Sequence, residues 1–228
     1  MRLRWIVATL AVMLVGYSSV RWVDLDVLVA VLTAAAIGAV GRLSGLGWGD
    51  MGLASTSWRR GLLWALCAFA LVAAVYVVIL LTPLDVLLDD TRYDDGWAQA
   101  WLTALVVVPL GTVLWEELAF RGVLWGQLHT RWSARVATIV SSLLFGVWHA
   151  LPALRFADSN ESVTTVSDGT GSTIGTISLT VLLTVVLTGL GGAVLCELRR
   201  RSDSLLAPIG LHWAINGLGV LAVAAAST

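Results

Sequence analysis

Long apolar runs separated by short polar stretches fill most of the chain. A helix that crosses a bilayer needs about 20 predominantly apolar residues. Seven runs come close to or exceed that length, and we expect spans at Trp5–Val20, Leu25–Leu43, Gly61–Thr82, Ala98–Leu128, Arg135–Phe156, Ile174–Glu197 and Leu205–Ala226. The sequence has no alternation of apolar and polar residues of the kind that a membrane barrel requires. The pattern therefore predicts an all-α, polytopic membrane protein with about seven transmembrane helices.

The composition supports this fold class and excludes one kind of partner. Hydrophobic residues make up 58% of the chain and the mean hydropathy is +0.87, whereas soluble domains contain about 45–50% apolar residues. The formal net charge is −1, so the chain has no strong basic field to attract nucleic acid. We expect an integral, multi-pass protein in contact with the lipid bilayer and no nucleic-acid partner.

The positions of the arginines predict an orientation in the membrane. If the seven runs alternate in direction, only Arg21, Arg92 and Arg155 fall on one side. Ten arginines fall on the other side, namely Arg2, Arg4, Arg42, Arg59, Arg60, Arg131, Arg135, Arg199, Arg200 and Arg201. Basic residues concentrate in cytoplasmic loops. The N-terminus is therefore expected in the cytoplasm and the C-terminus outside.

The fourth run carries charged residues where a spanning helix normally has only apolar ones. These residues are Glu116, Glu117 and Arg121. A charged side chain at the centre of a bilayer costs about 2.5–3.5 kcal/mol on insertion scales. Glu117 and Arg121 are four residues apart and can form an ion pair on one helix face. Glu116 is turned about 100° away from Glu117, so it needs another role.

Two later runs contain the other polar groups of interest. His149 lies in the fifth run, and His212 and Asn216 share one face of the seventh, four residues apart. Together with Glu116 they could form one cluster suited to hydrolysis. A carboxylate and an imidazole can deprotonate a water molecule, and imidazole and carboxamide N–H groups can stabilise an oxyanion. Alternatively, Glu116, His149 and His212 could bind zinc, which would itself activate the water.

The same polar residues also allow functions without catalysis. Buried polar side chains in membrane helices often serve as hydrogen-bonding contacts between helices. A non-catalytic immunity or chaperone-like membrane protein is therefore the alternative to an enzyme. A transporter that relays protons through buried Glu and His is a third option.

Three motifs resemble those of the CPBP intramembrane proteases, a family that includes type II CAAX prenyl endopeptidases and bacterial Abi proteins. The resemblance covers about residues 98–220 and rests on three motifs in this order, each in its own apolar run: Glu116-Glu117-x-x-x-Arg121, Phe145-x-x-x-His149 and His212-x-x-x-Asn216. It implies N-terminal transmembrane helices with an interfacial turn in residues 1–97 and a catalytic four-helix core in residues 98–228. We expect the last four spans to enclose a polar cavity that opens towards the cytoplasm.

The resemblance also implies roles for single residues. Glu116 would activate the water together with His149, and His212 and Asn216 would hold the oxyanion. Glu117 and Arg121 would support this site by fixing the helix. The implied activity is an endopeptidase that cuts a membrane-associated or lipidated protein or peptide. A prenylated peptide and a leader peptide are both open as substrates, as are a metal-free mechanism and one with zinc as cofactor.

Overall fold

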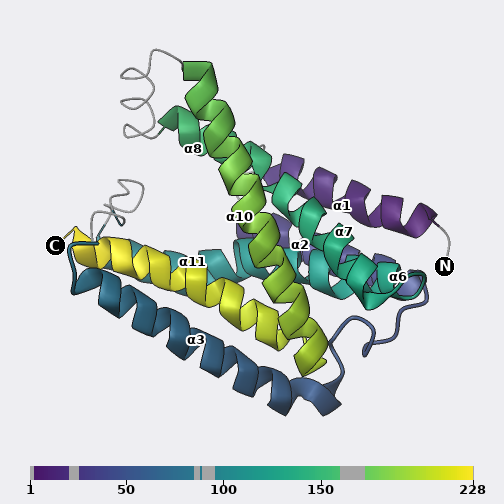
Figure 1. Cartoon of the computed structure of the whole chain (residues 1–228). Helices are drawn as coiled ribbons and strands as arrows, with labels where there is room; N and C mark the ends of the chain where they lie inside the picture. Colours follow the sequence, from purple (N-terminus) through teal and green to yellow (C-terminus); the bar gives the residue numbers. More distant parts are fainter. Residues whose placement is uncertain (1–2, 21–25, 85–87, 89–95, 160–172, 228) are drawn as a thin grey trace.

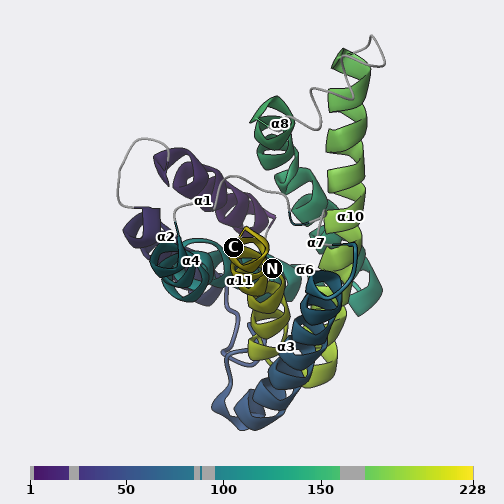
Figure 2. The same ribbon diagram turned by 90° about the vertical axis from the view of Figure 1, so that its left-hand side faces the viewer.

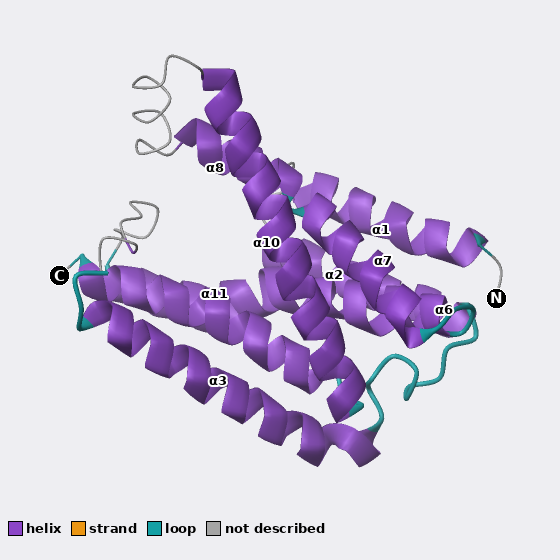
Figure 3. Ribbon diagram, in the orientation of Figure 1, coloured by secondary structure: helices purple, strands orange, loops and turns teal. Residues whose placement is uncertain are grey.

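The chain folds into a bundle of helices. The computed structural model describes residues 3–20, 26–84, 88, 96–159 and 173–227, and these residues contain helices and turns but no strand (Figures 1 and 3). The all-α prediction is confirmed. Three of the arginines used to predict the orientation, Arg2, Arg21 and Arg92, lie outside the described residues. The helices are α1 (Arg4–Val20), α2 (Asp26–Leu43), η1 (Ser55–Ser57), α3 (Trp58–Leu80), α4 (Trp97–Leu102), η4 (Thr103–Val113), α5 (Leu114–Glu117), η5 (Leu118–Leu124), α6 (Trp125–His129), α7 (Ala134–Trp148), α8 (Ala150–Ser159), α10 (Thr173–Ser202) and α11 (Leu206–Ala226).

All seven predicted runs are helical in the described residues. Two of them, Arg4–Ser19 and Val27–Leu43, are shorter than an ordinary span. Five are long and apolar enough to cross a membrane: Ser55–Leu80, Trp97–His129, Ala134–Leu154, Gly175–Ser202 and Leu206–Ala226. Many leucines on α3 and α10 are exposed, among them Leu66, Leu71 and Leu183. Such apolar outer surfaces suit contact with lipid chains rather than water.

The fourth span is one continuous helix in which α-helical and π-helical segments alternate. The segments η4 and η5 are π-helical and flank the short α-helix α5, which carries Glu116 and Glu117. Pro109 lies inside η4 and has no N–H to donate to the preceding turn. The N–H of Leu114 bonds to the carbonyl of Pro109, five residues earlier. Because π-helix is rare and often occurs at functional sites, this segment is a candidate location for catalytic residues.

The fifth span is broken at His149, whereas the sequence predicted one continuous helix. Helix α7 begins after Ser133, whose hydroxyl accepts a hydrogen bond from the N–H of Val136, as an N-cap should. It ends at Trp148, and α8 starts at Ala150. Pro152 explains this break, because it lacks the N–H that would bond to the carbonyl of Trp148.

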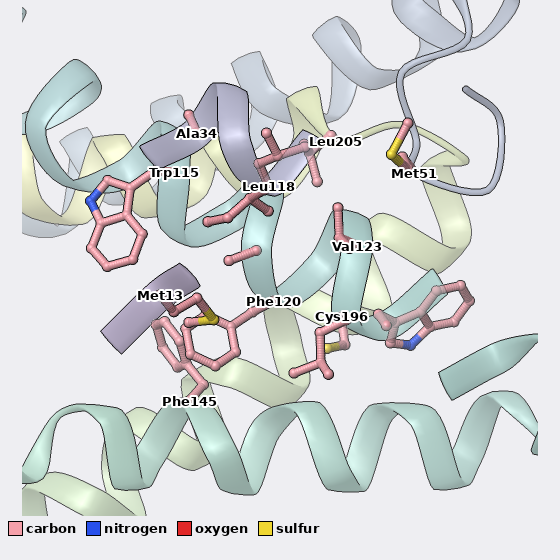
Figure 4. Close-up of a cluster of buried hydrophobic side chains, with 14 of the residues drawn as sticks. Met13, Ala34, Met51, Trp115, Leu118, Phe120, Val123, Phe145, Cys196 and Leu205 are labelled. Atoms are coloured by element: carbon pink, nitrogen blue, oxygen red, sulfur yellow. The ribbon is translucent and has the colours of Figure 1, made fainter. Parts of the chain in front are cut away.

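The main hydrophobic core joins the N-terminal helices to the fourth and fifth spans. Met13 of α1, Ile37 of α2, Phe120 of η5 and Phe145 of α7 belong to one buried cluster, part of which is drawn in Figure 4. The rings of Phe120 and Phe145 meet edge to face, with centroids 5.1 Å apart. Residues 1–97 and 98–228 therefore share this core.

Arginines gather at one end of the bundle, which we call the arginine end. It is formed by the start of α1, the end of α2, the starts of α3 and α7, and the end of α10, and lies on the right in Figure 1. Here the predicted interfacial turn, residues 44–53, is hydrogen-bonded to the end of α10 and to the turn that follows it. Arg199 donates to the carbonyls of Gly49 and Asp50 at 2.9 and 3.0 Å, and the N–H of Leu205 donates to Gly52 O at 2.8 Å.

Candidate active site

A cavity of about 900 Å³ lies among η4, α3, α7, α10 and α11. Helices α10 and α11 lie close together at the arginine end and diverge towards the opposite end (Figures 1 and 2). Three of the four predicted catalytic residues line this cavity: His149, His212 and Asn216. The structure therefore brings the second and third motifs together in one site.

The cavity extends away from the arginine end. On α11 it runs from Leu211 to Val223, and Leu88, which follows α3, also lines it. The expected opening of the cavity towards the cytoplasm stays a prediction. The connection from α10 to α11 spans only residues 203–205. Such a short turn holds the two helices together at the arginine end, so they can separate only beyond it.

His212 is held by the ion pair of the first motif. Arg121 Nη1 donates to Glu117 Oε1 at 2.9 Å, and both side chains have 0% exposure. The predicted pair within the helix is thus confirmed. The same Glu117 oxygen lies 2.8 Å from His212 Nδ1. Since a carboxylate accepts hydrogen bonds, Nδ1 of His212 carries a proton and Nε2 is left for the cavity.

Arg121 has a second contact besides the carboxylate. Its guanidinium carbon lies 3.9 Å from the centroid of the Phe145 ring. A cation over a desolvated aromatic face gains about 2 kcal/mol. This contact ties the ion pair on the fourth span to α7, the helix that carries His149.

The break in the fifth span fixes the tautomer of His149. The backbone N–H of His149 bonds to Gly146 O at 3.0 Å instead of continuing the regular helical pattern. The carbonyl of Phe145 is then available, and His149 Nδ1 lies 2.8 Å from it. A carbonyl oxygen can only accept, so Nδ1 carries the proton and Nε2 of a neutral His149 presents a lone pair.

Glu116 lies beside the cavity rather than in its wall. It is 5% exposed, and its Oε1 accepts a hydrogen bond from the indole N–H of Trp148 at 3.1 Å. Its Oε2 is buried and has no hydrogen-bond partner among the described residues. Thr112, four residues earlier and about one turn away, does line the cavity. Glu116 therefore continues the helix face that borders the cavity.

The predicted zinc ligands are bonded to different partners in this structure. In the described part of the chain, no group of three His, Cys, Asp or Glu side chains is close enough to hold a metal ion. Glu116 Oε1 is bound to Trp148, and Nδ1 of His149 and of His212 is bound to separate acceptors. Nε2 of each ring is left free, as in histidines that bind zinc, so the set Glu116, His149 and His212 stays a prediction.

The family of the chain follows from a comparison with known protein families. A family model described as "Type II CAAX prenyl endopeptidase Rce1-like" matches residues 97–218, which include all three motifs. The chain belongs to this family. No curated protein and no solved structure matches the chain significantly. Membership supports a CAAX-type intramembrane protease, a hydrolase that acts on a protein or peptide while embedded in the bilayer.

The sequence did not reveal two contacts that shape this site. One is the bond from His212 to Glu117, which joins residues 95 positions apart. The other is the bond from Trp148 to Glu116. A tryptophan inside a membrane span needs an acceptor for its N–H, so the sequence could have predicted that Trp148 is hydrogen-bonded. The sequence does not indicate that the acceptor is Glu116.

Proposed function

We propose that the protein is an intramembrane endopeptidase that hydrolyses a peptide bond of a membrane-associated or lipidated substrate, using a water molecule activated by Glu116 and His149. The observation that carries this proposal is the meeting of His149, His212 and Asn216 at one cavity inside an apolar bundle. Unpaired polar groups are expensive to bury in a membrane. A role in catalysis accounts for keeping them together.

Glu116 and His149 act on the water. The buried, unpartnered Oε2 of Glu116 and the lone pair on Nε2 of a neutral His149 are the two acceptors available for its protons. As the water oxygen attacks the carbonyl carbon of the substrate, a proton passes to this pair. The same proton then goes to the leaving amine nitrogen as the C–N bond breaks, which is general base followed by general acid catalysis.

His212 and Asn216 stabilise the oxyanion. His212 can donate from Nε2 when both of its ring nitrogens carry a proton, and the Glu117 carboxylate at Nδ1 holds the ring in position. Asn216 supplies a carboxamide N–H one helical turn further along α11. Donors of this kind can each contribute a factor of about 10²–10³ to turnover.

The apolar wall of the cavity suits a substrate that is already in the membrane. Leu187, Val194 and Val220 line it together with the polar residues. A lipid chain attached to a peptide and an apolar segment of a membrane protein both match this surface. The arginine end is proposed to face the cytoplasm, because basic residues gather there.

The test compares Glu116→Gln with the matched variant Glu117→Gln. Each protein is reconstituted in liposomes with a library of quenched fluorescent membrane peptides, and folding is checked by thermal unfolding. Glu116→Gln should fold but cleave nothing, because it keeps the shape of the side chain and loses the base. Glu117→Gln should still cleave, because its carbonyl accepts the hydrogen bond from His212. It should cleave more slowly than wild type, because it lacks the negative charge that pairs with Arg121. Cleavage by Glu116→Gln at the wild-type rate would refute the proposal.

A further inference from the structure

The π-helix η4 leaves the backbone carbonyl of Ala104 without its usual partner. In a π-helix, a carbonyl accepts a hydrogen bond from the N–H five residues later, as Pro109 O does from the N–H of Leu114. The residue five places after Ala104 is Pro109 itself, which has no N–H. Ala104 is only 1% exposed, and an unsatisfied carbonyl inside a membrane is costly. Its oxygen therefore needs a donor from elsewhere in the bundle.

Trp213 of α11 supplies that donor. Its indole Nε1–H donates to Ala104 O at 2.8 Å. The indole has room because Gly217, one turn further along α11, carries no side chain. A Cβ at Gly217 would lie 2.9 Å from Trp213 Nε1 and 3.2 Å from Ala104 O. The ring also stacks on Phe69 of α3, with centroids 5.3 Å apart. Trp213 is therefore held between η4 and α3.

The bond from Trp213 fixes the rotation of α11 about its own axis. Trp213 lies on the face of α11 that meets η4, and the next residue, His212, lies on a face turned by about 100°, which it shares with Asn216. A rotation that withdraws Trp213 from η4 would also move His212 Nδ1 away from Glu117 Oε1, which is 2.8 Å from it. Ala104 and Glu117 are several turns apart along the fourth span. Two attachments so far apart prevent α11 from turning or sliding.

We infer that Trp213 is a positioning residue of the proposed active site. Its hydrogen bond to Ala104 O sets the rotation of α11, and that rotation directs His212 and Asn216 towards the cavity that they line. Pro109 contributes by keeping this carbonyl free for a donor from another helix. The role rests on the proposed function, because directing these side chains matters only if they act on a substrate. The effect of the bond on His212 can nevertheless be measured without one.

The first experiment follows His212 in the full chain with no substrate present. The chain has three histidines, so NMR of protein with ¹⁵N-labelled histidine gives few signals, and His212→Ala assigns those of His212. Trp213→Phe keeps an aromatic ring but loses the N–H. It should shift the ring-nitrogen signals of His212, because the hydrogen bond to Glu117 is disturbed. The matched control Trp125→Phe removes an indole bond to Thr138 on another helix and should leave these signals unchanged.

The second experiment separates positioning from stability. Trp213→Phe leaves Ala104 O unsatisfied, so it should lower the unfolding temperature. With a peptide that the wild type cleaves, it should also lower kcat by up to about 100-fold with little change in KM. Adding Pro109→Ala supplies an N–H that can bond to Ala104 O within η4, so the double variant should regain its unfolding temperature. It should regain neither kcat nor the wild-type signals of His212, because the bond that fixes α11 is still missing.

The outcomes distinguish the role of Trp213 from the proposed function. If the double variant regains kcat and the His212 signals together with its unfolding temperature, Trp213 is only structural and the inference is overturned. Wild-type kcat and signals in Trp213→Phe would overturn it as well. The double variant carries the test even if Trp213→Phe alone does not fold. A wild type that cleaves no peptide, together with the expected shifts at His212, would instead overturn the proposed function and leave the positioning of His212 in place.

Discussion

Arg121 offers the most direct test of how the buried charges hold this fold. Changing it to methionine keeps a long apolar side chain but removes the guanidinium paired with Glu117. The Glu117 carboxylate, with 0% exposure, would then rely on His212 as its partner. The contact of the guanidinium with the Phe145 ring would also be lost.

The expected loss of stability follows from these contacts. Removing one partner of a buried ion pair costs about 3–5 kcal/mol, since the other charge stays behind uncompensated. The hydrogen bond from His212 Nδ1, 2.8 Å from Glu117 Oε1, remains in the variant and retains part of that energy. We therefore expect Arg121→Met to lose about 3 kcal/mol, near the lower limit of that range.

The measurement is thermal unfolding in detergent, compared with a double variant. Glu117→Gln combined with Arg121→Met buries no charge, and the new amide carbonyl can still accept the hydrogen bond from His212. The double variant should therefore recover most of the stability that Arg121→Met loses. It should cleave no faster than Glu117→Gln alone, because the amide at position 117 removes the negative charge beside His212.

The reasoning about Arg121 would be refuted by either of two results. One is Arg121→Met with the same unfolding temperature as wild type. The other is a double variant that is no more stable than the single one. In either case the free energy of the pair would be too small to organise the site, and the packing of α7 against the fourth span would have to explain the position of His212.

Three further predictions concern other contacts. Trp148→Phe should slow turnover and cost about 1–3 kcal/mol of stability, as measured by kcat and unfolding temperature, because it removes the indole N–H that holds the buried Glu116 carboxylate. Gly146→Ala should destabilise the bundle by about 1–3 kcal/mol, since its Cβ would lie 2.5 Å from Val185 O; the control Gly191→Ala meets nothing within 4 Å and should not. Purified protein stripped of metal with a chelator should keep its activity, and activity lost on stripping and restored by zinc would contradict the metal-free mechanism.

Local features of the fold and site were predictable because they depend on residues close in sequence. The seven helical segments follow from apolar runs, and the pair of Glu117 with Arg121 follows from a spacing of four. The break at His149 could also have been predicted, because Pro152 has no N–H to donate to the carbonyl of Trp148. The close approach of α10 and α11 at the arginine end could have been predicted from the short polar turn between their two apolar runs.

Other features depend on how the helices rotate and tilt against one another. The bond between Glu117 and His212 requires a particular rotation of α11 against the fourth span, and no spacing in the sequence encodes it. The divergence of α10 from α11, which forms the cavity, is likewise a matter of tilt. Within the π-helical segments, Pro109, two glycines and Arg121 differ from the apolar and threonine residues around them, and none of them specifies a π-helix.

The pinning of the interfacial turn by Arg199 has a consequence for the modularity of this protein. The family match starts at residue 97, yet that part of the chain uses carbonyls of Gly49, Asp50 and Gly52 as acceptors. A fragment from residue 97 onward would lose those acceptors and the packing of α3 against α11. It should misassemble when produced alone. Two separate polypeptides, 1–84 and 96–228, keep every one of these contacts between them, so they should reassemble as a split protein when produced together in one membrane.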